Sequence, residues 1–305
     1  MKQSDKATLI GLIAIILWST IVGLIRSVSD YLGATGGAAM IYTLASVFLL
    51  LSVGWVRLRE FPSRYLLWGS ILFVCYELCL ALSIGYAHNS QQAIEVGMVN
   101  YLWPTFTIVA AILFNGQKTN WLIAPGLLLS MMGIGWILGG EQGLSLHSIW
   151  LNVQDNPLSY GLAGAGALIW ASYSTLTARI AQGKNGITLF FMLTAGVLWI
   201  KYLGQGAQEM VFTIPALVYL LLAAIAMGFG YAAWNVGILH GNVTILAGAS
   251  YFIPVLSAAL STLLLQAPLT LTFWQGSAMV CCGALLCWLA TRARKTIPIK
   301  SRQAS

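Results

Sequence analysis

VNYLWPTF, residues 99–106, places an amide, a phenol, an indole and a proline inside a long apolar stretch of the chain. A second run, ASYFIPVL at residues 249–256, has the same tyrosine followed three residues later by a proline. Proline removes a backbone donor from a helix, so this pattern is unusual within an apolar segment. Its appearance twice in the same order indicates a duplicated structural element.

The duplication extends well beyond these two runs. The matched pairs, all 150 or 152 residues apart, are Trp18 with Trp170, Ser83 with Asn235, Gly85 with Gly237, His88 with His240, Tyr101 with Tyr251, Pro104 with Pro254, Gly126 with Gly276, and Gly133 with Gly283. An ordered set at nearly one offset predicts two copies of a unit about half the chain long.

Composition places the chain in a membrane. Of its 305 residues, 59% are hydrophobic and 8% charged, with a mean hydropathy of +0.83. Soluble domains contain about 25% charged residues. The net charge of +7 is carried near the ends of apolar segments, which favours the lipid bilayer as partner and excludes nucleic acid.

Apolar segments of about 20 residues are long enough to cross a bilayer. The first runs from Lys6 to Arg26 without a small-residue cleavage site, so we expect a retained span and not a signal peptide. The ten predicted spans are 7–26, 34–56, 65–87, 91–114, 120–140, 158–181, 186–204, 213–239, 242–265 and 270–291.

Basic residues predict the orientation of these spans. If the N-terminus is cytoplasmic, 13 of the 15 Lys and Arg residues lie inside, and only Arg26 and Lys201 lie outside. Both termini are then cytoplasmic. Each copy holds five spans, an odd number, so the second copy enters the membrane from the opposite side.

The fold class we expect is therefore an all-α membrane protein with ten transmembrane helices in two inverted repeats. The predicted parts are a first five-helix repeat at 1–140, a periplasmic connector at 141–156 with a small interfacial helix, a second five-helix repeat at 157–292, and a basic cytoplasmic tail at 293–305. Inverted repeats are typical of secondary transporters, whose substrate site lies near the midplane.

Motifs for other chemistries are missing from the sequence. It has no G-x-x-x-x-G-K-[ST] for ATP and no H-E-x-x-H for zinc. Ser250 and His240 could suggest a protease, but ten residues of helix separate them by about 15 Å, and a general base must lie within about 3 Å of its nucleophile. The five cysteines lie in apolar runs, and we interpret them as packing residues. We predict no enzyme, cofactor, metal site or disulfide.

Glu77 is the most informative single residue. It lies near the middle of the third span, where a carboxylate is costly and commonly functional. It could carry a proton, balance a substrate ammonium group, or form a hydrogen bond that locks two helices together. Glu95 lies nearer the outer end of its span, where we expect it to reach water.

The remaining candidates are amides, hydroxyls, aromatic rings and prolines. Ser83, Asn100 and Asn235 could line a polar cavity or form interhelical hydrogen bonds. Pro104 and Pro254 could act as hinges or as ordinary kinks. Deep aromatic residues could pack in the core or enclose a cavity for flat solutes; these are Trp18, Tyr76, Tyr101, Trp103, Trp170 and Tyr251.

The pattern of [SN]-x-G-x-x-H, Y-x-x-P and spaced glycines resembles the EamA-type repeat of the drug/metabolite transporter superfamily. Over about residues 5–292 the chain looks like the bacterial aromatic amino acid exporters of that superfamily. The stretches that carry this likeness are YELCLALSIGY, QQAIEVGMVNYLWP, LFNGQKTNW, YAAWNVGILHGNVTI and SYFIPVLS. Many members end the fourth and ninth spans with Gly-Glu, whereas this chain has Asn115-Gly116-Gln117 and Gln266-Ala267-Pro268.

The resemblance implies a central cavity lined by the third, fourth, eighth and ninth helices together with the first and sixth. It also implies export of aromatic amino acids (Phe, Tyr, Trp) across the bacterial inner membrane by alternating access. In that interpretation the aromatic residues enclose the substrate ring, and Glu77, Asn100, Ser83 and Asn235 meet its polar ends. A broader exporter of small metabolites or drugs is the alternative. Coupling and oligomeric state stay open, and a monomer is compatible with the sequence.

Overall fold

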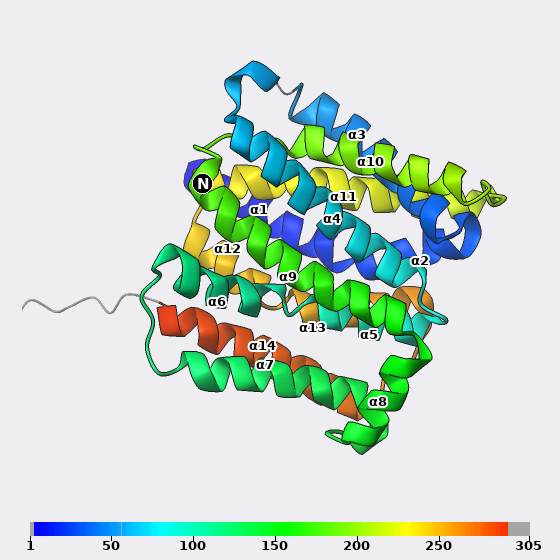
Figure 1. Ribbon diagram of the computed structural model, residues 1–305, viewed down its shortest axis with the longest axis vertical. Coiled ribbons are helices and arrows are strands. Elements are labelled where there is room, and N and C mark those ends of the chain that lie inside the picture. The colour runs from blue at the N-terminus through cyan, green and yellow to red at the C-terminus, as the bar shows by residue number, and fades with distance from the viewer. Residues whose placement is uncertain (1–2, 56, 292–305) are drawn as a thin grey trace, which may run out of the picture.

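The computed structural model describes residues 3–55 and 57–291 (Figure 1). The predicted basic tail, 293–305, lies outside these residues. Every regular element in the described part is a helix, which confirms the all-α class. The α-helices are α1 (Gln3–Ser19), α2 (Ile21–Leu32), α3 (Ala34–Ser52), α4 (Ser63–Gly85), α5 (Ser90–Asn100), α6 (Trp103–Asn115), α7 (Ile123–Leu138), α8 (Leu146–Asp155), α9 (Pro157–Ile180), α10 (Ile187–Gly204), α11 (Ile214–His240), α12 (Val243–Ser250), α13 (Ile253–Leu265) and α14 (Leu271–Thr291), with short 3₁₀ turns at Leu58–Glu60 and Gly140–Gln142.

Several of these helices can cross a membrane. Within the described residues there are six candidate membrane spans: the single helices α3, α4, α10, α11 and α14, and the segment Ser90–Asn115, which contains α5 and α6. There are seven if the bent pair α1–α2 counts as one span. Helices α7 and α13 are apolar but shorter. The predicted connector 141–156 contains α8, a helix of 10 residues.

Both Y-x-x-P runs interrupt their helices at the same place. Helices α5 and α6 are separated by Tyr101 and Leu102, and α12 and α13 by Tyr251 and Phe252. In each break a backbone N–H bonds the carbonyl three residues back: Leu102 to Val99 at 3.2 Å and Phe252 to Ala249 at 3.1 Å. The following proline has no N–H to continue the α-helical pattern, so the chain starts a new helix at that point.

A third break, between α1 and α2, corrects the expected first span of 7–26. The helix pair continues to Leu32 after a bend of 42° at Thr20. Thr20 donates its backbone N–H (3.1 Å) and its hydroxyl (2.7 Å) to the carbonyl of Leu17. The Ser19 hydroxyl bonds the Ile15 carbonyl at 2.7 Å. Such bonds from hydroxyl side chains to the preceding turn can bend a helix without a proline.

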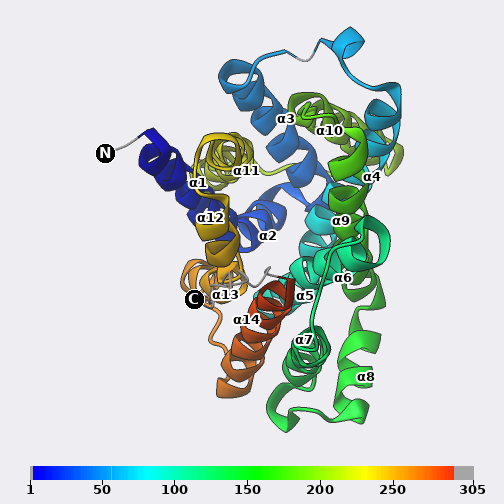
Figure 2. The same cartoon turned by 90° about the vertical axis from the view of Figure 1, so that its left-hand side faces the viewer.

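Helices α7 and α14 pack side by side and run in opposite directions (Figures 1 and 2). Glycines allow their backbones to meet. A Cβ placed on Gly133 would lie 2.7 Å from the carbonyl oxygen of Gly276, and one on Gly283 would lie 2.6 Å from that of Gly126. Gly126 therefore contacts Gly283, the repeat partner of Gly133. Gly133 contacts Gly276, the repeat partner of Gly126. Such a reciprocal contact is what a two-fold relation between two similar units produces.

Two further helix pairs surround the centre of the molecule. Helix α1 packs along α11, and α4 packs along α9. In the end-on view of Figure 2, α1, α11 and α12 lie on one side of the centre, and α4, α9 and α6 on the other. These helices position the side chains described below.

The cysteines only partly follow the interpretation as packing residues. All five, each within the described part, are free thiols. Cys79, Cys281 and Cys287 are buried, whereas Cys75 and Cys282 are exposed on the helix surface.

Candidate functional site

A cavity of about 230 Å³ lies between α1–α2, α4, the α5–α6 break, α9, α11 and the α12–α13 break. Two of its sides are formed by the interrupted helices, so each Y-x-x-P run has its break at the cavity wall. The lining residues are Trp18, Ile21, Val22, Tyr76, Glu77, Leu80, Asn100, Tyr101, Trp103, Trp170, Ser174, Met227, Tyr231, Trp234, Ser250 and Ile253.

Aromatic rings form a large part of the wall, with seven of the sixteen lining residues. Trp170 on α9 lies 4.5 Å from Tyr76 and 5.9 Å from Trp103, between ring centroids. On the side formed by α1 and α11, the rings of Trp18 and Tyr231 contact each other edge to face, with 5.0 Å between their centroids. Aromatic pairs interact favourably at such distances. A flat apolar solute in this cavity would therefore meet rings on opposite sides.

Glu77 contributes the carboxylate of the cavity wall and is fully buried. The hydroxyl of Tyr231 on α11 donates to its Oε1 at 2.7 Å. The hydroxyl of Tyr42 on α3 donates to its Oε2 at 2.5 Å. These two hydrogen bonds join α3, α4 and α11 at one carboxyl group.

Asn100, the last residue of α5, adds an amide to the wall. Its side chain is buried, and Nδ2 donates to the carbonyl of Ala163 on α9 at 3.3 Å. Space for this amide depends on Gly166, because a Cβ at that position would lie 2.8 Å from Asn100 Nδ2. Hydroxyls of Ser174 and Ser250 complete the polar lining. Within the described residues, no group of three or more His, Cys, Asp or Glu side chains is placed to hold a metal ion.

The structure brings together seven of the ten residues proposed from sequence: Trp18, Tyr76, Glu77, Asn100, Tyr101, Trp103 and Trp170. Three do not line the cavity. Ser83 is buried and donates to the Leu80 carbonyl at 2.9 Å, within its own helix. Asn235 is half-buried beside the lining residue Trp234. Tyr251 is buried with its ring 5.9 Å from Trp288. Pro104 and Pro254 are the second residues of α6 and α13, the helices that follow the breaks.

Sequence reasoning did not include several lining residues. Ser250, Ser174 and Ile253 are the repeat partners of Asn100, Val22 and Trp103, so transfer of each candidate to its partner position would have found two of the three. Tyr231 lies one turn before Asn235, and Trp234 lies directly beside it. The sequence indicated Asn235 because of its amide, whereas the two aromatic residues line the cavity.

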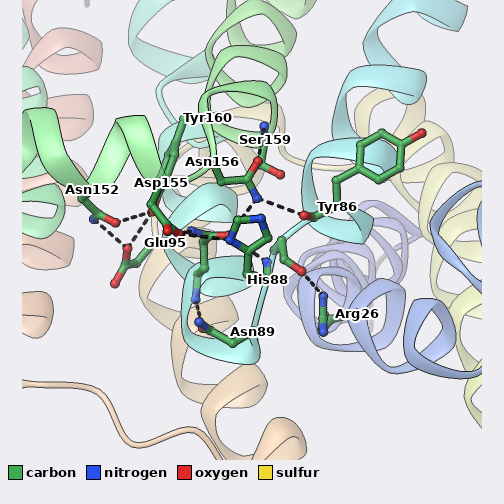
Figure 3. A network of polar contacts seen from close by, with 12 residues as sticks. Arg26, Tyr86, His88, Asn89, Glu95, Asn152, Asp155, Asn156, Ser159 and Tyr160 are labelled. Atoms are coloured by element: carbon green, nitrogen blue, oxygen red, sulfur yellow. Dashed lines mark hydrogen bonds and ion pairs between the residues drawn. The ribbon is translucent and has the colours of Figure 1, made fainter.

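A second polar cluster lies apart from the cavity and joins α8 to the rest of the molecule (Figure 3). Asp155 accepts a hydrogen bond from Gln92 at 2.9 Å and contacts His88 Nδ1 at 3.1 Å. The Asn156 amide donates to the carbonyl of Tyr86 at 2.9 Å. The cluster fastens the connector helix to the start of α5.

Glu95 belongs to the same cluster, so the expectation that it reaches water is wrong. It is buried, and its Oε2 accepts from Tyr160 at 2.9 Å and Asn152 at 3.1 Å (Figure 3). Helix α8, which the sequence placed only as part of a connector, supplies Asn152 and covers this carboxylate.

Comparisons with known proteins place the chain among transporters. The model of the EamA-like transporter family matches residues 158–289. Proteins named aromatic amino acid exporter YddG from Salmonella typhimurium and Escherichia coli K12 are each 62% identical to this chain, covering 95% and 94% of it and 99% and 98% of their own lengths. The protein of that name from Ancylobacter novellus is 26% identical over 84% of the chain and 88% of its own. A solved crystal structure that is 23% identical to this chain superposes with a TM-score of 0.67 over 94% of this chain and 99% of that one, which shows a shared fold.

Proposed function

The chain belongs to the EamA-like transporter family, among the bacterial aromatic amino acid exporters, and from that premise we propose that it exports Phe, Tyr and Trp across the inner membrane by alternating access. The carrying observation is the central cavity, in which aromatic rings surround a space that also contains a carboxylate and an amide. These are the groups that an aromatic ring and an amino acid backbone would require.

In this proposal each part of the substrate has a partner. Trp18, Trp170, Tyr76, Tyr101 and Trp103 enclose the aromatic ring. The α-ammonium group meets Glu77, and the α-carboxylate accepts hydrogen bonds from donors such as Asn100 and the nearby serine hydroxyls, Ser174 and Ser250. Ser83, Asn235 and Tyr251 lie outside this cavity, and we assign them to the pathway in another conformation.

We also propose ten membrane spans in two inverted copies, 1–140 and 157–292, joined by a periplasmic connector at 141–156, with both termini cytoplasmic. The helix breaks make α1–α2, α5–α6 and α12–α13 one span each. Reciprocal contact of the repeat-related glycines in α7 and α14 supports the inversion, as does their antiparallel direction. Matched lining positions support it too: Trp18 with Trp170 and Asn100 with Ser250.

Alternating access needs places where helices can change direction. The breaks before Pro104 and Pro254 lie at the cavity wall, one in each copy. Broken helices at the midplane are typical of secondary transporters. We assign both prolines as hinges through which the cavity is exposed to one face or the other.

Transport by the purified chain in proteoliposomes tests the proposal. Vesicles containing the protein should take up labelled Phe, Tyr and Trp faster than protein-free vesicles, and unlabelled aromatic amino acids should compete. Failure to move all three would reject the proposal, and equal rates for structurally unrelated metabolites would favour the broader exporter. The same vesicles with an imposed pH gradient show the coupling, because accumulation above equilibrium requires proton movement and equilibration alone indicates facilitated diffusion.

A further inference from the structure

The two hydroxyls bound to Glu77 differ in their access to the cavity. Tyr231 lines the cavity, and its ring lies 5.0 Å from Trp18 and 5.3 Å from Phe191. Tyr42 is fully buried behind Glu77 and is not among the described lining residues; its ring packs 5.4 Å from Phe191. One oxygen of Glu77 is therefore covered by a group that a solute can reach, and the other by a group that it cannot.

A buried carboxylate oxygen needs a donor at all times, because leaving it unpaired is costly. Tyr231 provides that donor to Oε1 at 2.7 Å. A substrate ammonium group offers three N–H donors and a full positive charge, whereas a phenol offers one O–H and no charge. The ammonium group is thus the stronger partner for the same oxygen.

We propose that the Tyr231 hydroxyl is an exchangeable partner of Glu77, which the α-ammonium group of the substrate displaces, and that Tyr42 is a permanent support. This inference rests on the proposed function of the cavity. It makes Tyr231 a determinant of specificity. Solutes that carry an amine can replace its hydrogen bond, and aromatic acids without an amine leave it in place.

The exchange also changes a contact between helices. The bond from Tyr231 to Glu77 joins α11 to α4, which the repeat assigns to opposite copies. Displacement of the Tyr231 hydroxyl removes this bond and leaves the bond between α3 and α4 through Tyr42 intact. Occupation of the cavity would therefore weaken one connection between the two copies.

Binding of two matched ligands to purified protein tests the inference without requiring transport. Tryptophan carries the amine, and indolepropionate has the same ring and carboxylate without it. Isothermal titration gives the Kd of each for wild type, Tyr231→Phe and Tyr42→Phe. In Tyr231→Phe, Kd for tryptophan should fall about three- to tenfold, because no hydroxyl competes for Glu77. Kd for indolepropionate should stay at its wild-type value.

Tyr42→Phe is the matched control, since it removes the same chemical group from the other oxygen of Glu77. It should change both dissociation constants by the same factor. An equal effect of Tyr231→Phe on both ligands, or no effect on either, would overturn the inference. If Tyr231→Phe does not fold, Glu77→Gln should weaken tryptophan binding and spare indolepropionate, and loss of both would again count against it. Wild-type binding without transport in vesicles would reject the proposed function separately.

Discussion

Trp170 lines the cavity and contacts aromatic rings on two other helices of its wall, α4 and α6. Its ring lies 4.5 Å from Tyr76, 5.2 Å from Tyr173 and 5.9 Å from Trp103. Aromatic pairs contribute about 0.5–1.5 kcal/mol each beyond burial. Trp170→Leu should therefore raise KM for tryptophan uptake about three- to tenfold. The control is Trp121→Leu, at a site 78% exposed, and an equal change in both variants would contradict a role of Trp170 in the cavity.

Two glycines on α9 offer a second prediction for single residues. A Cβ at Gly166 would press on the Asn100 amide at 2.8 Å, whereas nothing lies within 4 Å of a Cβ at Gly164. Gly166→Ala should displace the Asn100 side chain and break its bond to Ala163, because the amide is the end of a side chain that can move. We expect KM for uptake to rise with little change in thermal stability. Gly164→Ala should leave KM unchanged and thermal stability unchanged or slightly higher. A large loss of stability in Gly166→Ala would contradict this prediction.

At the scale of elements, sequence predicted some helix breaks and missed another for a clear physical reason. Pro104 and Pro254 signal their breaks because proline cannot donate a backbone hydrogen bond. The break at Thr20 carries no such residue, and it depends on hydroxyl bonds to the preceding turn. Thr43, Ser46 and Thr175 form the same kind of bond within helices that continue unbroken. The position of a serine or threonine alone therefore could not identify the 42° change of direction between α1 and α2.

The contact between α7 and α14 gives a prediction at the same scale. A Cβ at Gly133 would lie 2.7 Å from the Gly276 carbonyl oxygen and 2.8 Å from the Val280 backbone nitrogen, so the backbones must separate. Gly133→Ala should lower stability by about 1–3 kcal/mol, as overpacking does. Gly196→Ala on α10, with nothing within 4 Å, should be neutral or stabilising by about 0.5–1 kcal/mol. Thermal unfolding in one detergent measures both, and equal midpoints would argue against close packing of α7 and α14.

At the scale of the whole molecule, the repeat predicted where the cavity residues come from better than it predicted which residues they are. Trp18 and Trp170 line the cavity as a matched pair. Tyr101 lines it, but its partner Tyr251 packs against Trp288 instead. Two copies of a sequence unit share a backbone path, whereas each side chain responds to neighbours that differ between the copies. Tyr231 could not be derived from the repeat, because its partner position holds Cys79.

The inverted arrangement makes a prediction that depends on the complete chain. After replacement of the five native cysteines, single cysteines at Gln142 and Gln208 should react with a membrane-impermeant thiol reagent added to spheroplasts. Cysteines at Thr119 and Gln182 should react only after the membrane is opened. All four side chains are exposed, so accessibility within the protein does not decide the result.

The four sites sample one loop of each copy on each side of the membrane. Thr119 and Gln142 follow the fourth and fifth spans of the first copy, and Gln182 and Gln208 follow the first and second spans of the second copy. If the two copies were parallel, the labelling pattern of Gln182 and Gln208 would be the reverse of the one predicted. If cysteines at Thr119 and Gln142 were both labelled from outside, the proposed span between them would be ruled out.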